Sequence, residues 1–197
     1  MSPRTQKQFE EMRETRRLQI METALKLFAL EGYNHCSISM LAREAGISKG
    51  LMYNYFDSKE ALLAAIIGHG MNEIMDLFDP DHDGVLESEE LVEFIRKVFS
   101  AMRERQEYWI LFISVIMQPR VKEHFQDKPV VHSIQQFMAM LYAYFEKRGY
   151  EDPYLEVVTL SALIEGFGVL LIYAYPAVEF PVELMEKFEN RIIDMYK

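Results

Sequence analysis

Residues 79–90 hold six acidic side chains and neither lysine nor arginine. Three of them, Asp79, Asp81 and Asp83, alternate with other residues, so their carboxylates can converge on one turn of the chain. A hard divalent cation such as calcium takes about six to eight oxygen ligands in flexible geometry. Carboxylates at this density repel one another unless a cation is bound among them. The segment therefore predicts a divalent-cation site.

The order of residues in this segment resembles the calcium loop of an EF-hand, which follows D-x-[DN]-x-[DN]-G-x5-E. Gly84 stands where that loop turns sharply, and Val85 would offer its main-chain carbonyl. Glu87 would ligate through water, and Glu90 would close the site with both oxygens. Apolar residues occupy the flanking positions, so residues 71–99 resemble a whole EF-hand. The expected metal ligands are Asp79, Asp81, Asp83, Val85, Glu87 and Glu90.

Two simpler interpretations of the same residues stay open. Aspartate and glycine are common in loops, and Ser88 with the neighbouring glutamates would cap the following helix. EF-hands usually occur in pairs, and the sequence contains one such pattern, so the loop would bind weakly or would take magnesium or a lanthanide ion. Calcium or magnesium is the cofactor that these residues imply, and no organic cofactor is expected.

A second group of polar residues has the spacing that DNA recognition requires. Residues 37–56 predict two short helices joined by the turn "AGIS", with Ser37 and Ser48 as N-caps. Met52 and Phe56 lie four residues apart and, with their apolar neighbours, would anchor the second helix inward. An amide on the outer face can pair with an adenine edge, and a phenol or an ammonium can contact phosphate. The outward residues are Lys49, Gly50, Tyr53 and Asn54.

The run "SISMLAREAGISKGLMYNYFDSKEALL" resembles the N-terminal domain of the TetR family of transcriptional repressors, over roughly residues 14–74. The resemblance implies phosphate contacts from Tyr53 and Lys59, and base reading at Lys49, Leu51 and Asn54. The family commonly has threonine where this chain has Leu51, so an apolar contact with a thymine methyl would replace a hydroxyl contact. The expected DNA-contacting residues are Ser37, Ser39, Ser48, Lys49, Gly50, Leu51, Tyr53, Asn54, Tyr55 and Lys59.

The rest of the chain has the 3.6-residue apolar period of helices and no run typical of strands. We therefore expect an all-α protein. The resemblance to the TetR family implies a three-helix helix-turn-helix domain at 14–74 and a helical effector-binding and dimerisation domain at 75–197. The cation loop at 79–90 belongs to the second domain. The helices are expected at 9–30, 37–45, 48–56, 57–78, 90–105, 108–118, 129–149, 153–175 and 181–197.

The resemblance further implies a homodimer that pairs through its last two helices and reads a near-palindromic operator in double-stranded DNA. Ser161, Ala162, Gly166 and Gly168 would let partner helices approach closely. The aromatic and methionine residues of the second domain would line a pocket for a small apolar effector, although at helical spacing they equally suit a plain core. The expected pocket residues are Trp109, Phe112, Met117, Phe137, Met140, Tyr144, Phe167 and Tyr173.

Composition limits the location and the class of the protein. The net charge of −10 is uneven: residues 1–67 carry +1 and residues 68–197 carry −11, so the N-terminal part can approach phosphate. Cys36 is the only cysteine, the N-terminus lacks the apolar block of a secretory signal, and no apolar run approaches the roughly 18 residues of a membrane span. A cytoplasmic protein is expected, with no membrane partner. Since the sequence has no catalytic motif, we expect no enzyme.

The combined interpretation is a transcriptional repressor controlled by a small effector and, through the loop, by a cation. Cation occupancy would shift the balance between DNA-competent and incompetent arrangements, with bending of the fourth helix concentrated at Gly68 and Gly70. Close packing would also explain these two glycines. There are two alternatives. One is a calcium-binding signalling or buffering protein with a vestigial DNA-binding unit, and the other is a scaffold for protein partners.

Overall fold

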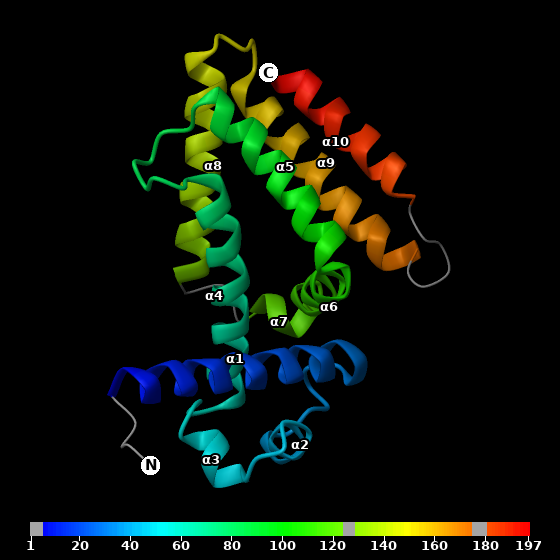
Figure 1. The fold of residues 1–197 in the computed structure, drawn as a ribbon. Coiled ribbons are helices and arrows are strands. Elements are labelled where there is room, and N and C mark those ends of the chain that lie inside the picture. Colours follow the sequence, from blue (N-terminus) through cyan, green and yellow to red (C-terminus); the bar gives the residue numbers. More distant parts are fainter. Residues whose placement is uncertain (1–5, 124–128, 175–180) are drawn as a thin grey trace. The chain divides into compact units, whose positions relative to one another are not determined.

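The computed structural model describes the backbone of residues 6–123, 129–174 and 181–197, and the side chains of 6–121, 131–170 and 181–197 (Figure 1). Within these ranges the chain is helical and contains no strand, which confirms the all-α prediction. The helices are α1 (Gln6–Glu31), α2 (Ile38–Glu44), α3 (Lys49–Tyr53), α4 (Lys59–Phe78), α5 (Ser88–Glu104), α6 (Gln106–Ile116), α7 (Pro119–Glu123), α8 (Pro129–Lys147), α9 (Pro153–Ala174) and α10 (Val182–Tyr196).

Contacts between residues divide the chain into two compact units. The first is Met1–Gly68 with Val115–His124, and the second is His69–Ser114 with Phe125–Lys197. The division thus falls at Gly68, whereas the sequence suggested a boundary at 74. It also gives the end of α6 and α7 to the first unit. The helices α4 and α6 are continuous across the division and connect the two units covalently.

The first unit forms around the C-terminal half of α1. Ile20, Ala24 and Phe28 lie four residues apart on one face and are almost fully buried, as the helical period predicted. Gly32 ends the helix with a φ of +82°, the left-handed conformation expected at this position. Sequence reasoning missed Gln118, whose amide donates to the carbonyl of Phe28 (3.0 Å) and accepts from the main-chain N–H of Tyr33 (2.9 Å). One side chain thus satisfies main-chain groups at the end of α1.

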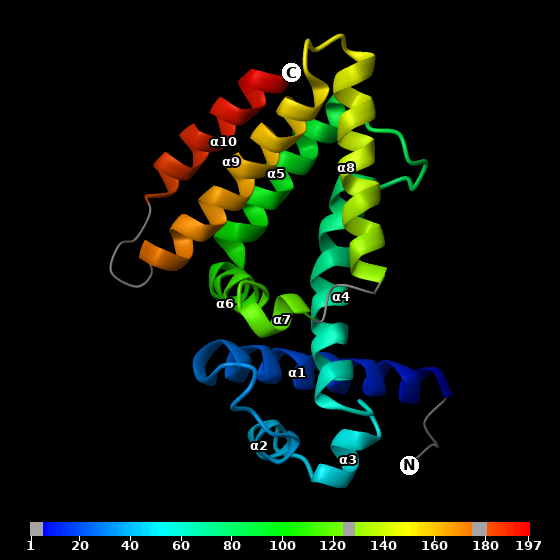
Figure 2. The same ribbon diagram turned by 180° about the vertical axis from the view of Figure 1, so that it is seen from behind.

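The second unit packs its helices around a continuous apolar core. The helices α8 and α9 run side by side, and α5 packs against α10 (Figure 1 and Figure 2). Arg103 of α5 pairs with Glu189 of α10 at 2.7 Å. The phenol of Tyr144 donates to the carbonyl of Tyr196 at 3.1 Å, which fastens α8 to the end of α10.

The two glycines of α4 have different surroundings. A Cβ built on Gly70 would lie 2.5 Å from Cε2 of Phe112, so only glycine lets α4 approach α6 this closely in the second unit. A Cβ on Gly68 meets nothing within 4 Å. Close packing therefore explains Gly70 but not Gly68, and α4 is regular through both positions.

Two helices, Lys59–Phe78 and Pro153–Leu170 within α9, are long and apolar enough to cross a membrane by length and composition alone. The expectation that no stretch reaches that length is therefore wrong. The core helices of soluble proteins pass the same test, so the property is weak evidence for a membrane protein.

Candidate DNA-binding and cation sites

Residues 38–53 form two short helices whose starts are fixed by serine caps. The Ser37 hydroxyl accepts a hydrogen bond from the N–H of Met40 (3.2 Å), and the Ser48 hydroxyl accepts one from Leu51 (3.1 Å). Gly46, in the turn between the helices, has a φ of +65°, which glycine adopts without strain. The helix-turn-helix geometry predicted from the sequence is therefore present, although α3 ends at Tyr53 and not at Phe56.

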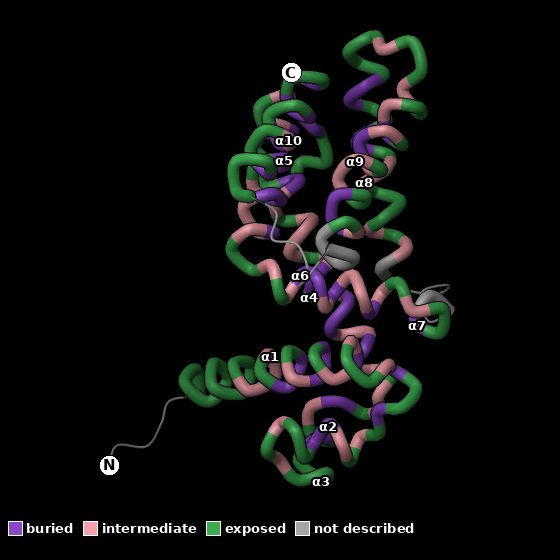
Figure 3. The backbone as a smooth tube through the Cα atoms, turned by 90° about the vertical axis from the view of Figure 1, so that its right-hand side faces the viewer, coloured by how far each residue is buried: buried purple, intermediate pink, exposed green. Residues whose placement is uncertain are grey.

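Four of the five residues of α3 are exposed, and the fifth, Met52, is buried (Figure 3). Met52 is completely buried and Phe56 nearly so, as the spacing predicted. Leu51 is 39% exposed and Tyr53 is 45% exposed. The other expected contact residues around α3 divide in the same way: Lys49, Gly50 and Asn54 are exposed, and Tyr55 is half-buried. Ser37, Ser39 and Ser48 are also exposed.

Two arginines of α1 donate hydrogen bonds to the C-terminal ends of α2 and α3. Arg16 donates to the carbonyl of Ala45, the C-cap of α2, at 3.0 Å, and Arg13 donates to the carbonyl of Asn54, the C-cap of α3, at 3.4 Å. A cation at a helix C-terminus pairs with carbonyls that lack a partner within the helix. These arginines therefore position the two short helices. Local sequence patterns gave no sign of these contacts.

Lys59 has a structural role that the sequence did not reveal. Its ammonium donates to the carbonyls of Tyr33 (2.9 Å) and Cys36 (3.0 Å), and lies 4.2 Å from the centre of the Tyr33 ring. The Tyr33 phenol donates to Glu60 at 3.3 Å. Burial, and then the charge of Glu60, raise the pKa of this phenol above its ordinary value, so it stays protonated as the donor. The start of α4 thus fixes the loop that leads into α2, and phosphate contact by Lys59 stays a prediction.

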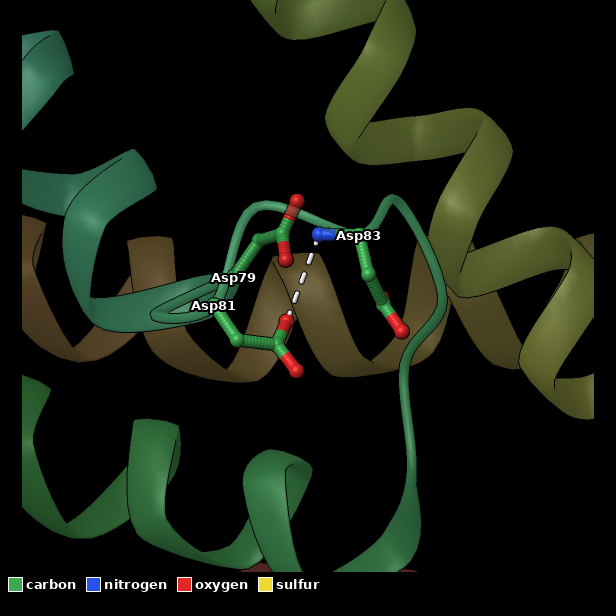
Figure 4. A group of neighbouring side chains, drawn as sticks. All are labelled: Asp79, Asp81 and Asp83. Atoms are coloured by element: carbon green, nitrogen blue, oxygen red, sulfur yellow. Dashed lines mark hydrogen bonds between the residues drawn. The ribbon is translucent and has the colours of Figure 1, made fainter.

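The three aspartates of the acidic loop converge, with one carboxylate oxygen of each within 4.8 Å of the other two (Figure 4). Asp79 is 5% exposed, whereas Asp81 and Asp83 are exposed. Asp79 Oδ2 accepts from the N–H of Gly84 at 3.2 Å. Its Oδ1 is buried and has no hydrogen-bond donor among the described residues. A buried carboxylate oxygen without a donor is costly, and a cation held among the three carboxylates would relieve that cost. The residues therefore fit a divalent cation.

The loop backbone adopts the sharp turn expected at its centre. Gly84 has a φ of +75° and His82 a φ of +58°. Asp81 Oδ1 accepts from the N–H of Asp83 (3.3 Å), and Asp83 Oδ1 accepts from the N–H of Val85 (2.7 Å). These short-range bonds fix the carboxylates of Asp81 and Asp83 against the loop backbone.

The other two expected carboxylate ligands are engaged elsewhere. Glu90 accepts a hydrogen bond from the N–H of Glu87 at 2.9 Å, at the start of α5. The Glu87 carboxylate pairs with the ammonium of Lys147, at the end of α8, at 2.9 Å. The N-cap of α5 is Glu87, and not Ser88 as the capping interpretation suggested. The structure thus brings three of the predicted ligands together and holds Glu87 and Glu90 in a helix start.

Half of the expected pocket residues belong to the continuous core of the second unit or pack against it. Met140, Tyr144 and Phe167 are buried in this core, and Phe137 is half-buried against it. Trp109 and Phe112 are buried on α6. Met117 is 47% exposed and belongs to the first unit, and the side chain of Tyr173 lies outside the described residues. The indole N–H of Trp109 is buried without an acceptor among the described residues. It is the polar group in this set that an effector could engage.

The helix α9 presents apolar and small residues to solvent. Tyr154 is 64% exposed, Leu155 56% and Leu170 55%. Of the four small residues noted in the sequence, Ala162 and Gly166 are exposed and Ser161 is half-buried. The fourth, Gly168, is buried, and a Cβ there would lie 2.8 Å from Ile113. Part of the predicted set therefore faces outward, and Gly168 serves the internal packing of the second unit.

Comparison with known proteins agrees with this geometry. A family model described as "Bacterial regulatory proteins, tetR family" matches residues 20–66, and one for the EF hand domain matches residues 70–98. The Bacillus subtilis regulator YuxN, described as an uncharacterized HTH-type transcriptional regulator, is 53% identical over 58 residues, which are 29% of this chain and 20% of YuxN. YerO of the same organism, described in the same way, is 33% identical over 108 residues, or 53% of this chain and 37% of YerO. The matches thus span less than half of these two relatives.

The fold of the whole chain also has solved counterparts. A TetR family transcription regulator from Marinobacter aquaeolei aligns with a TM-score of 0.68 at 19% identity, covering 94% of this chain and 97% of that one. At this identity the likeness concerns the fold. The helix-turn-helix segment of this chain is thus similar in sequence to that of the tetR family of bacterial regulatory proteins, and the whole chain has a TetR-like fold.

Proposed function

We propose that the protein is a sequence-specific DNA-binding transcriptional regulator, a repressor without enzymatic activity that acts in the cytoplasm. The observation that carries the proposal is the exposed face of α3, with Lys49, Tyr53 and Asn54 outward and Met52 buried beneath them. Such a face on a capped second helix suits the major groove. The Arg13 contact supports it because it fixes α3, which would carry the recognition residues, and the Arg16 contact fixes α2, the other helix of the motif.

A homodimer follows from the exposed surface of α9. Leu155 and Leu170 are more than half exposed, and the small residues Ala162 and Gly166 lie on the same helix. An apolar helix surface of this kind is typical of a protein interface. Two copies related by a twofold axis would place their α3 helices in successive grooves, so the operator would be near-palindromic. A small apolar effector would enter among the aromatic residues around Trp109, whose indole N–H could anchor it.

Selection from a library of randomised DNA duplexes tests this proposal and can be carried out before the operator sequence is known. We expect the full chain to enrich sequences with two related half-sites about one helical turn apart, in opposite orientation. Failure to enrich any sequence, with a correctly folded protein, would contradict DNA recognition. Calcium binding without enrichment of any DNA sequence would favour the calcium-buffering alternative. Binding of a protein partner, with neither calcium binding nor DNA enrichment, would favour the scaffold alternative.

A second candidate function is divalent-cation binding in the loop, which is supported by the buried and unpaired Oδ1 of Asp79. A bound calcium or magnesium ion would neutralise the converging carboxylates. Asp79, Asp81 and Asp83 would hold the ion, and the carbonyl of Val85 with Glu87 and Glu90 would complete the ligand set. Because Asp79 directly follows α4, occupancy of the loop would bias the arrangement of that helix and thus DNA affinity.

Operator affinity with calcium and with a chelator tests the regulatory part. We expect the affinity for the selected duplex to differ by about fivefold or more between the two conditions. The variant Asp79→Asn keeps an acceptor for Gly84 and removes the charge, so its affinity should not change with calcium. If the original protein binds the duplex with the same affinity in calcium and in chelator, the regulatory proposal is refuted, even where calorimetry shows that calcium binds.

A further inference from the structure

The helix α8 contacts the EF-hand-like segment at two places, both within the second unit. The ring of Phe137 lies 4.3 Å from that of Phe78, where α4 enters the loop, and 5.8 Å from that of Phe94, in α5. The ammonium of Lys147 lies 2.9 Å from the carboxylate of Glu87. The helix α8 thus contacts both the apolar flanks of the segment and its acidic loop.

The contact with Glu87 falls on a residue that the cation would use. Glu87 is the ninth residue of the loop, a position that ligates calcium through water. The loop itself has no lysine or arginine, so Lys147 brings it a positive charge from 60 residues away in the sequence. The two side chains are 65% and 58% exposed, so water and salt screen their pair and a divalent ion can replace it.

We propose that Lys147 is a tethered competitor of the cation for Glu87, so that cation binding releases the end of α8. The inference rests on the proposed cation site. A divalent ion at Asp79 and its neighbours repels the ammonium and attracts the same carboxylate, so each weakens the binding of the other. Lys147 is the last residue of α8, and the chain turns at Gly149 before α9 begins. The loop is thereby coupled to the connection between α8 and α9.

Calorimetric titration of the full chain with calcium chloride tests the proposal. We expect Lys147→Met to bind calcium about threefold more tightly than the original protein, a change of the size of an exposed ion pair. Lys97→Met is the matched control, because Lys97 pairs with Glu93 at 3.6 Å on the exposed side of α5 and is also accessible. It should leave the affinity unchanged.

A double-mutant cycle separates competition at Glu87 from a general effect of charge. In a Glu87→Gln background, Lys147→Met should no longer tighten calcium binding. A tightening that persists there would overturn the proposal, and so would equal affinities for Lys147→Met and the original protein. In both cases the cation site would stand. If the original protein shows no calcium binding at all, the site itself is refuted together with this inference.

Hydrogen exchange supplies a readout that does not depend on affinity. Calcium should speed amide exchange at the end of α8 in the original protein, because the Lys147 contact is lost. In Lys147→Met the exchange should already be fast without calcium and should not change with it. Equal calcium responses in the two proteins would contradict the release of α8.

Discussion

Replacing Lys49 and Tyr53 together with alanine is expected to lower the affinity for the selected duplex by about 100-fold, since each lost DNA contact costs about 1–3 kcal/mol. Both side chains are exposed on α3, and the helix is held by Met52 on its other side. The change should therefore leave the fold and the melting temperature almost unchanged. Fluorescence anisotropy with labelled duplex measures the affinity, and circular dichroism measures the melting.

A matched control removes the same two residue types elsewhere. Lys97 of α5 and Tyr142 of α8 are accessible and belong to the second unit, away from the helix-turn-helix sequence. Replacing both with alanine should leave DNA affinity within about twofold of the original. An equal loss for the control pair, or no loss for the α3 pair, would show that α3 is not the surface that reads DNA.

Gly70→Ala is expected to lower the free energy of unfolding by about 1–3 kcal/mol, the cost of overpacking a filled core. The added methyl would lie 2.5 Å from Cε2 and 2.6 Å from Cζ of the buried Phe112 ring, which cannot move aside freely. Gly68→Ala is the matched variant two residues earlier in α4, with open space around the new methyl. It should raise the free energy of unfolding by about 0.5–1 kcal/mol through helix propensity.

Urea unfolding followed by circular dichroism measures both variants. We expect the free energy of unfolding to fall in Gly70→Ala and to rise in Gly68→Ala. If both variants were stabilised alike, α4 and α6 would not pack closely at Gly70, and both glycines would then be candidates for bending.

The helical periodicity of the sequence was sufficient to predict most of the fold. The apolar face of α1, its end at Gly32 and the serine caps of α2 and α3 are local features, and the structure has them where the pattern indicated. The start of α5 was predicted two residues late, because Glu87 caps the helix in place of a residue with higher N-cap preference. The short helix α7 was missed, since five residues give no period to read.

The contacts that position the sites could not be predicted, because they join residues far apart in the sequence. Gln118 reaches the end of α1, Arg13 reaches the end of α3, and Lys147 reaches Glu87, each across more than 40 residues. The spacing of the aspartates did predict their convergence, since alternate residues of a tight loop share one side. Hydrophobic residue type alone did not distinguish pocket residues from core residues, and four of the eight expected pocket residues lie in or against the core of the second unit.

The most direct test of the central claim is the affinity and stoichiometry of the original protein on its selected duplex at increasing salt. We predict two chains per duplex, in contact through α9, and an affinity that falls by about 100-fold or more between roughly 50 and 200 mM salt as phosphate contacts are lost. One chain per duplex, or an affinity independent of salt, would contradict a dimer that inserts two α3 helices into successive grooves.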